Sequence, residues 1–394
     1  MWRRILEPPR LRIGEAGERH ATWMELFFDL VFVVAISQLA ERLAARPTVV
    51  GAIEFALLFV PVWWAWNGAT FYADRFGTDD LIDRLFLLAQ MAAGAVMAIA
   101  VGDAFGAEAV GFALSYAAFR YVLAARYALV RRYVRAAGRF ASVHAQGFGL
   151  GATLWAVSVF VPPPERFIFW GVAMVADLAT PVAAARLHAE VPPHPRHLPE
   201  RFGLFTIIVL GDAIAEAVEA LRDAPVDWLD GVSAILALGL AFSFWWVYFE
   251  GMDPIAVRAA LRARRIAPYE LWIYAHLPFT AAVTATGVGV RLAIMTESHV
   301  ALPAADRWLL CSAAGVCFGS LGAIQVAQAA GAGRRRALAP TWPLWAATLA
   351  SLLAGALGTR LTASGLVAIL AALGALQVIR DLRGRARRAV TPGG

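Results

Sequence analysis

The sequence predicts an all-α, polytopic integral membrane protein with about 12 transmembrane helices. The first observation is the composition: of 394 residues, 60% are hydrophobic and 16% charged, against roughly 45–50% and 25% in soluble domains. The second is a mean hydropathy of +0.62. The third is the recurrence of apolar runs near the roughly 20 residues that a helix needs to cross a bilayer. A soluble globular, disordered or disulfide-stapled protein is excluded, because apolar residues dominate and only 2 Cys are present.

The expected spans follow one another with short connections. They are predicted at 22–43, 50–72, 82–102, 108–130, 140–161, 166–188, 200–221, 228–249, 269–291, 303–328, 341–359 and 363–380. Connections as short as 161–164 leave little chain for a domain outside the bilayer. We therefore expect a cytoplasmic N-terminal segment (1–21), two six-helix membrane units (22–190 and 191–380) and a basic cytoplasmic tail (381–394).

The arginines predict the orientation of these spans. All 35 basic side chains are arginine; 27 fall on the side that holds the N-terminus, 7 on the opposite side, and Arg120 lies within the fourth span. An excess of positive charge marks the cytoplasmic side, so both termini are expected there. The sequence pI of 9.8 then reflects membrane topology, and we expect the lipid bilayer as a partner rather than nucleic acid.

The two halves of the chain show a weak internal repeat. An offset of 175 residues places Glu25 on Glu200, and tryptophan-rich clusters end the second span at 63–66 and the eighth at 245–248. Because six spans are an even number, the two units have the same orientation in the membrane. Parallel six-helix repeats are typical of transporters and channels, with the pathway at the repeat interface.

Carboxylates inside the expected spans are the first candidate site residues. Glu25 and Asp29 are spaced i,i+4 on one face of the first span, and Asp212 and Glu216 repeat that spacing in the seventh. Charged groups in hydrocarbon are costly, so these pairs are candidates for a cation or proton route. In the alternative interpretation, Glu25 and Glu216 are interfacial and only Asp29 and Asp212 are immersed.

Three further polar residues are expected to lie in the bilayer. Arg120 in the fourth span carries a fixed charge, and Asp177 in the sixth either neutralises it or is a separate protonatable site. We predict that the two interact. His276 in the ninth span is a candidate proton relay, although a histidine bonded to a neighbouring helix is the commoner explanation.

The remaining motifs indicate no conventional enzyme. The tryptophans of 63–66 and 245–248 predict an aromatic belt at the membrane interface more readily than a ligand cage. The chain has no P-loop, HExxH, GxSxG or CxxC motif at a spacing that supports hydrolysis, redox or zinc chemistry. We expect no catalytic residue, no metal site and no cofactor.

Two segments carry a resemblance to a known family. Residues 19–39 (RHATWMELFFDLVFVVAISQL) and 200–212 (ERFGLFTIIVLGD) resemble the two recurrent motifs of the bacterial low temperature requirement protein A family. The second motif usually ends in glutamate, so Asp212 shortens that side chain by one methylene. The resemblance implies a polytopic inner-membrane protein, from a family with no agreed biochemical activity.

A fainter resemblance concerns ion channels. Phe28-Asp29 in a first span, over two six-helix units, is similar to lysosomal-type potassium channels with an F-S-D motif in the first helix. Phe28 replaces the serine of that motif, and the second half of the chain lacks it. A cation channel is therefore kept as an alternative.

The functional expectation is a secondary transporter or ion-coupled permease that uses Asp29 and Asp212 as cation or proton sites. Its partners would be a cation or proton and a small solute. The alternative from another class is a non-transporting membrane sensor or structural protein whose intramembrane charges lock helices together. The sequence leaves the substrate and the oligomeric state open.

Overall fold

The computed structural model describes residues 8–12, 20–188, 190–223, 228–252, 266–297, 299–331 and 341–390. Within these residues the chain forms 12 α-helices joined by loops and short 3-10 turns. The described part contains no β-strand, and an isolated antiparallel bridge joins Ala301 and Thr362. The predicted all-α class is confirmed.

The chain divides into two compact units. The first comprises Met1–Leu39 and Leu57–Phe202, and the second comprises Ala40–Ala56 and Gly203–Gly394. The expected six-helix units, with their boundary at 190, and the internal repeat stay predictions.

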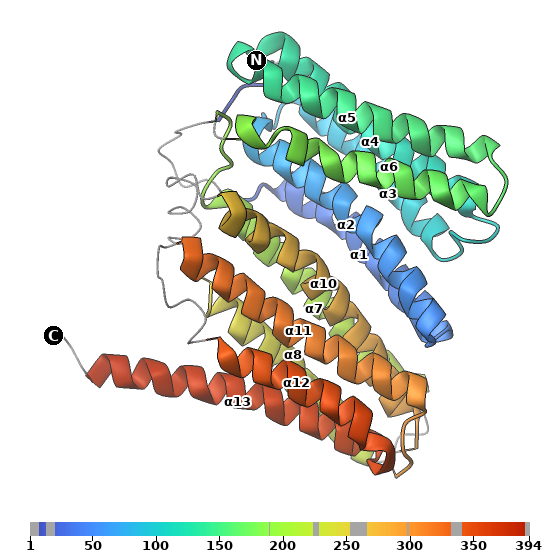
Figure 1. Cartoon of the computed structure of the whole chain (residues 1–394), viewed down its shortest axis with the longest axis vertical. Helices are drawn as coiled ribbons and strands as arrows, with labels where there is room; N and C mark the ends of the chain where they lie inside the picture. The colour runs from blue at the N-terminus through green and yellow to red at the C-terminus, as the bar shows by residue number, and fades with distance from the viewer. Residues whose placement is uncertain are drawn as a thin grey trace. The chain divides into compact units, whose positions relative to one another are not determined.

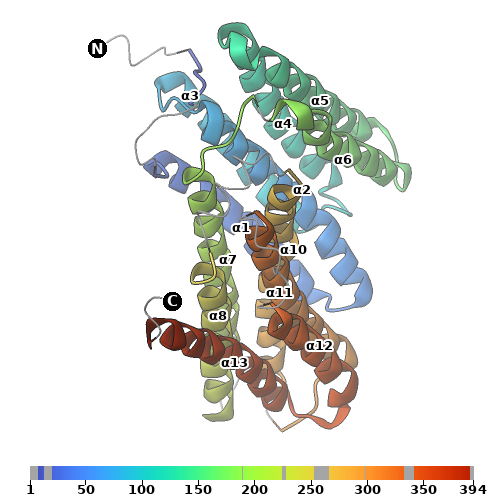
Figure 2. The ribbon, with the colours of Figure 1, turned by 60° about the vertical axis from the view of Figure 1, so that its left-hand side comes forward.

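The first unit is built from the helices of the N-terminal half. Within it α4 (Ala109–Tyr133) packs against both α3 (Leu81–Val101) and α5 (Gly138–Val157), and α5 packs against α6 (Glu165–Ala183). Figures 1 and 2 both show α4, α5 and α6 side by side. Its aromatic core includes Phe76, Tyr127, Phe140 and Phe148. The first unit also contains most of α1 (Trp23–Ala45) and of α2 (Val49–Phe76), and the first turns of α7 (His197–Asp223).

The second unit holds the rest of α7 and the five helices that follow. Here α10 (Ile266–Met295) packs against α11 (Ala304–Gly331), α11 against α12 (Trp342–Leu357), and α8 (Trp228–Phe249) against α13 (Ala363–Val390) (Figure 2). A Cβ added at Gly289 would lie 2.7 Å from Leu310 Cα, so this glycine permits the close approach of α10 and α11.

Nine segments in the described part of the chain are long and apolar enough to cross a membrane. They are 23–45, 49–76, 81–101, 165–187, 228–249, 267–295, 304–331, 342–360 and 363–386. The protein is a membrane protein in contact with lipid. The helices α4, α5 and α7 are not among the nine, so twelve crossings and the orientation of the termini stay predictions.

The tryptophan clusters are less exposed than a membrane belt requires. Trp63, Trp64 and Trp66 on α2 are buried, and Trp245 and Trp246 on α8 are half-buried. The belt interpretation of residues 63–66 is wrong, because these indoles pack inside the first unit: Trp63 and Trp66 both contact the ring of Phe202.

Candidate functional site

A capping box positions the first carboxylate of α1. The backbone N–H of Thr22 donates to Glu25 Oε2 at 2.8 Å, and the backbone N–H of Glu25 donates to Thr22 Oγ1 at 3.2 Å. This reciprocal T-x-x-E arrangement fixes the first turn of the helix. Glu25 is thereby held at the N-terminus of α1, and Asp29 follows one turn later on the same face.

Asp29 is paired with a guanidinium group. Arg201 Nη2 donates to Asp29 Oδ1 at 2.7 Å, and the indole N–H of Trp66 donates to the same oxygen at 2.9 Å. All three side chains are fully buried. The carboxylate that sequence analysis singled out therefore has both a cation and a neutral donor to compensate its burial.

His197 lies between two carboxylates. Its Nδ1 is 2.9 Å from Asp74 Oδ1, and its Nε2 is 3.2 Å from Glu25 Oε2. The backbone N–H of His194 donates to the other oxygen of Asp74 at 2.7 Å. The imidazole is buried and can donate to both carboxylates only in its protonated form.

The contacts of Glu25 with His197 and of Asp29 with Arg201 follow the same residue spacing on both helices. Glu25 and Asp29 on α1 are spaced i,i+4, as are their partners His197 and Arg201 at the start of α7. Each residue of one pair meets the matching residue of the other, in the same chain order. We call this set, together with Trp66 and Asp74 of α2, the α1–α2–α7 network.

The neighbours of His197 determine its charge. The residue lies ahead of the span predicted at 200–221. Burial alone would lower the pKa of His197, but the hydrogen bonds and negative charges of Asp74 and Glu25 outweigh burial and raise this pKa above its ordinary value. The site can therefore hold a proton near neutral pH and exchange it if the contacts to either carboxylate change.

Some polar atoms of the network lack a hydrogen-bond partner within the described part of the chain. Asp29 Oδ2 and the Nε and Nη1 atoms of Arg201 are buried without a hydrogen-bond partner among the described residues. Buried polar atoms are usually satisfied, and exceptions concentrate at functional or hydrated sites. Asp29 Oδ2 can therefore accept a further hydrogen bond, and the two guanidinium nitrogens can donate further ones.

A second buried ion pair joins α4 and α6. Arg120 Nε donates to Asp177 Oδ2 at 2.8 Å, and the hydroxyl of Tyr116 donates to the same oxygen at 2.7 Å. The predicted interaction of Arg120 with Asp177 is confirmed. Glycines on adjacent helices make room for it: a Cβ added at Gly68 would lie 2.6 Å from Arg120 Nη1, and one at Gly151 would lie 2.6 Å from Asp177 Oδ1.

A third pair, which sequence analysis missed, joins α3 and α4. Arg126 Nη2 donates to Asp83, its Nη1 donates to Gln90 Oε1 at 2.8 Å, and its guanidinium lies 4.0 Å from the centre of the Tyr72 ring. Arg126 was counted with the cytoplasmic arginines because it lies near the end of a span. Its fully buried position shows that it links helices instead.

The remaining candidates lie in the second unit. Asp212 and Glu216 on α7 are both buried, and Arg291 Nη1 donates to Glu216 Oε2 at 3.0 Å. His276 Nε2 is 3.0 Å from the hydroxyl of Tyr248 on α8, and its Nδ1 is 2.6 Å from the carbonyl of Trp272. His276 is therefore bonded to a neighbouring helix, as the commoner explanation predicts.

Three residues of the α1–α2–α7 network were missed as site residues. Arg201 was counted among the loop arginines, Asp74 was not singled out, and Trp66 was assigned to the interface. The i,i+4 spacing of His197 and Arg201, which matches Glu25 and Asp29, was the available signal. Despite the acids around His197, the described residues contain no group of three or more His, Cys, Asp or Glu arranged to hold a metal ion.

Comparison with known proteins gives a match that includes Glu25, Asp29 and Arg201, which come from segments 19–39 and 200–212. The family model of the bacterial low temperature requirement A protein matches residues 20–376. An uncharacterized protein of Rhizobium meliloti (strain 1021) is 31% identical in an alignment of 301 residues, and the match covers 71% of this chain and 71% of the relative. The family resemblance of segments 19–39 and 200–212 is confirmed, and the match extends over nearly the whole sequence. The chain belongs to the bacterial low temperature requirement A protein family.

Proposed function

We propose that the protein is a proton-coupled secondary transporter of the bacterial inner membrane, with no enzymatic activity, in which His197 carries the proton. The observation that carries this proposal is the placement of the His197 imidazole between Glu25 and Asp74. A single proton on this ring determines whether it donates to both carboxylates or to only one.

The charge balance of the α1–α2–α7 network supports ion coupling. Its three carboxylates outnumber its two cationic side chains even when His197 is protonated. Loss of the proton leaves the imidazole neutral and removes one positive charge from beside Glu25 and Asp74, which is costly in a buried place. Release of the proton is therefore favourable only when a cation, a solute or a rearrangement of α1 and α7 compensates it.

The proposal changes the role that sequence analysis gave to Asp29. Because Arg201 neutralises it, Asp29 holds the start of α7 against α1, and the proton moves to the neighbouring His197. Asp212 remains the proposed second site, in the other unit. Glu216 beside it is compensated by Arg291.

One observation favours the second candidate, a non-transporting structural or sensory protein. The Arg120–Asp177 pair is fully buried and enclosed by glycines, an arrangement that suits a fixed helix contact. If all the buried charges serve this purpose, no solute should be moved.

Everted membrane vesicles with a pH gradient separate the candidates. Na⁺, K⁺ and pools of sugars, amino acids and organic cations are added while a pH-sensitive dye reports the gradient. We expect at least one addition to dissipate the gradient with the wild type and with His299→Gln, which alters an exposed histidine, but not with His197→Gln. No response from the wild type supports the structural candidate, and K⁺ flux that is independent of the gradient supports a channel.

A further inference from the structure

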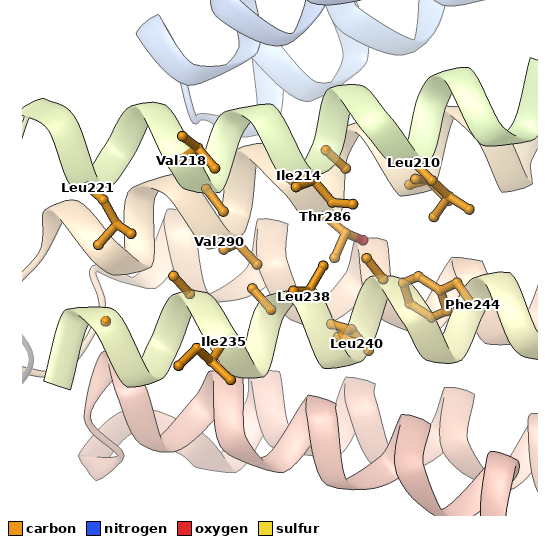
Figure 3. A pocket seen from close by; sticks show the side chains of 18 residues that line it. Leu210, Ile214, Val218, Leu221, Ile235, Leu238, Leu240, Phe244, Thr286 and Val290 are labelled. Carbon is orange, nitrogen blue, oxygen red and sulfur yellow. The ribbon is translucent and has the colours of Figure 1, made fainter.

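A long cavity in the second unit is lined by none of the charged groups assigned above. It has a volume of about 240 Å³ and is lined by α7, α8 and α10. In Figure 3, Ile214 and Val218 of α7 face Ile235 and Leu238 of α8 across the cavity, and Thr286 and Val290 of α10 lie between the two rows. We call this cavity the α7–α8 groove.

The wall of the groove is hydrocarbon. Thr286 is the one lining residue with a polar side chain, and its hydroxyl already donates to the carbonyl of Ala282 at 2.7 Å. Sites for polar solutes place a few polar groups to orient the ligand. This groove offers none among its lining residues, so its chemistry suits an aliphatic ligand rather than an ion or a polar solute.

The groove is long and closed at the back. Its wall on α7 runs from Leu210 to Leu221, which corresponds to about 16 Å at 1.5 Å per residue. A Cβ added at Gly287 of α10 would lie 2.7 Å from Ala213 Cα, so α10 and α7 touch behind the groove. A slender, extended chain fits this shape.

The open side of the groove is continuous with the surface that lipid covers. Ile235, Leu238 and Val218 on its rim are 69%, 52% and 51% exposed, and α8 is one of the apolar candidate spans. A second helix, 10–12 Å across with its side chains, is too wide to enter between these rows and can only rest on the rim. A lipid acyl chain reaches the groove directly from the bilayer.

We propose that the α7–α8 groove binds one acyl chain of a membrane phospholipid. Each methylene that leaves the bilayer exchanges one apolar environment for another, so the gain comes from van der Waals packing against a preformed wall. Occupation of the groove by a chain also fills a cavity that would otherwise weaken the contact between α7 and α8. The proposal is independent of proton coupling at His197.

Photolabelling of the protein in lipid vesicles tests whether a phospholipid acyl chain occupies the α7–α8 groove. The full chain is reconstituted in phosphatidylcholine that contains a small fraction of a phospholipid with a diazirine in one acyl chain, illuminated, digested and analysed by mass spectrometry. We expect adducts on groove-wall residues that are buried from the bulk lipid, such as Leu240 and Ala237, as well as on exposed Ile235.

Two glycines of α8 provide a matched pair of variants. Gly231 lines the groove and Gly239 does not, and a Cβ added at either meets nothing within 4 Å. We expect Gly231→Phe to reduce the adducts on Leu240 and Ala237 at least fivefold and Gly239→Phe to leave them unchanged. Ala234→Phe, which also fills the groove, replaces Gly231→Phe if that variant does not fold.

Three results would overturn the proposal. The first is labelling confined to exposed residues and unaffected by the filling variants, which shows ordinary surface lipid. The second is labelling of the buried wall by a diazirine fatty acid but not by the phospholipid. The third is a cross-link from the groove to a second copy of this chain.

Discussion

Arg201 at the start of α7 donates to Asp29 of α1 at 2.7 Å, and neither side chain is exposed to solvent. The two residues are 172 positions apart in the sequence and belong to the two segments that carry the family resemblance. Their pairing explains why a carboxylate is tolerated among the apolar residues of α1, and it brings both motifs to one network.

The first prediction is a coupled loss of stability at Asp29 and Arg201. Removal of one partner of a buried pair leaves the other charge uncompensated, which costs about 3–5 kcal/mol. Arg201→Leu and Asp29→Leu should each lower the melting temperature and folded yield in detergent. The double variant should lose clearly less than the sum, and additive losses would show that the two side chains stabilise the fold separately.

Arg120 and Asp177 should behave in the same way. Arg120→Leu leaves Asp177 with the hydroxyl of Tyr116 as its remaining donor among the described residues, so folded yield should fall. Addition of Asp177→Leu should partly restore it, because an apolar pair of similar volume is tolerated where a lone charge is not. Melting curves of the four proteins give the coupling energy, and a value near zero contradicts the pairing.

Alanine substitutions at two glycines of α5 distinguish a packing clash from the general stabilising effect of alanine in a helix. Alanine in place of glycine within a helix usually stabilises by roughly 0.5–1 kcal/mol. Gly149→Ala meets nothing within 4 Å and should follow this rule, whereas a Cβ at Gly151 lies 2.6 Å from Asp177 Oδ1 and should destabilise the protein. Equal melting temperatures for the two variants would mean that α5 and α6 do not approach this closely.

The position of a charged residue in its span decides whether the sequence predicts its pairing. Arg120 and Asp177 lie deep in theirs, where a charge needs a partner, so their pairing could be predicted. Arg201 and Arg126 lie near span ends, where arginine ordinarily sets topology. The spacing of Arg201 from His197, which matches that of Glu25 and Asp29, is the sequence signal for an inward position of Arg201, and no such pattern marks Arg126. The sequence places Trp66 at the end of the second span, where an indole suits the membrane interface, but α2 continues to Phe76 and the indole packs against Phe202 instead.

The twelve predicted crossings have a direct test in reporter fusions. Fusions at Ala107 and Pro163 should report the external side, and a fusion at Arg135 the cytoplasm. A fusion at Arg335, which lies outside the described residues, should also report the cytoplasm. The test matters most for α4, α5 and α7, which are not among the nine long apolar segments. A cytoplasmic signal at Pro163 would contradict both the crossings and the six-helix repeat.

The central claim is that His197 exchanges a proton while held between Glu25 and Asp74, and nitrogen-15 NMR of histidine-labelled protein in bilayers measures this most directly. The chain has 7 histidines, and the signal lost in His197→Gln identifies the one concerned. We expect the His197 ring to be doubly protonated at pH 6.5 and to lose its proton as the pH rises. The midpoint should lie above the ordinary histidine pKa of about 6.5. A ring that stays in one protonation state from mildly acidic to strongly basic pH, or that titrates below its ordinary pKa, would contradict the account.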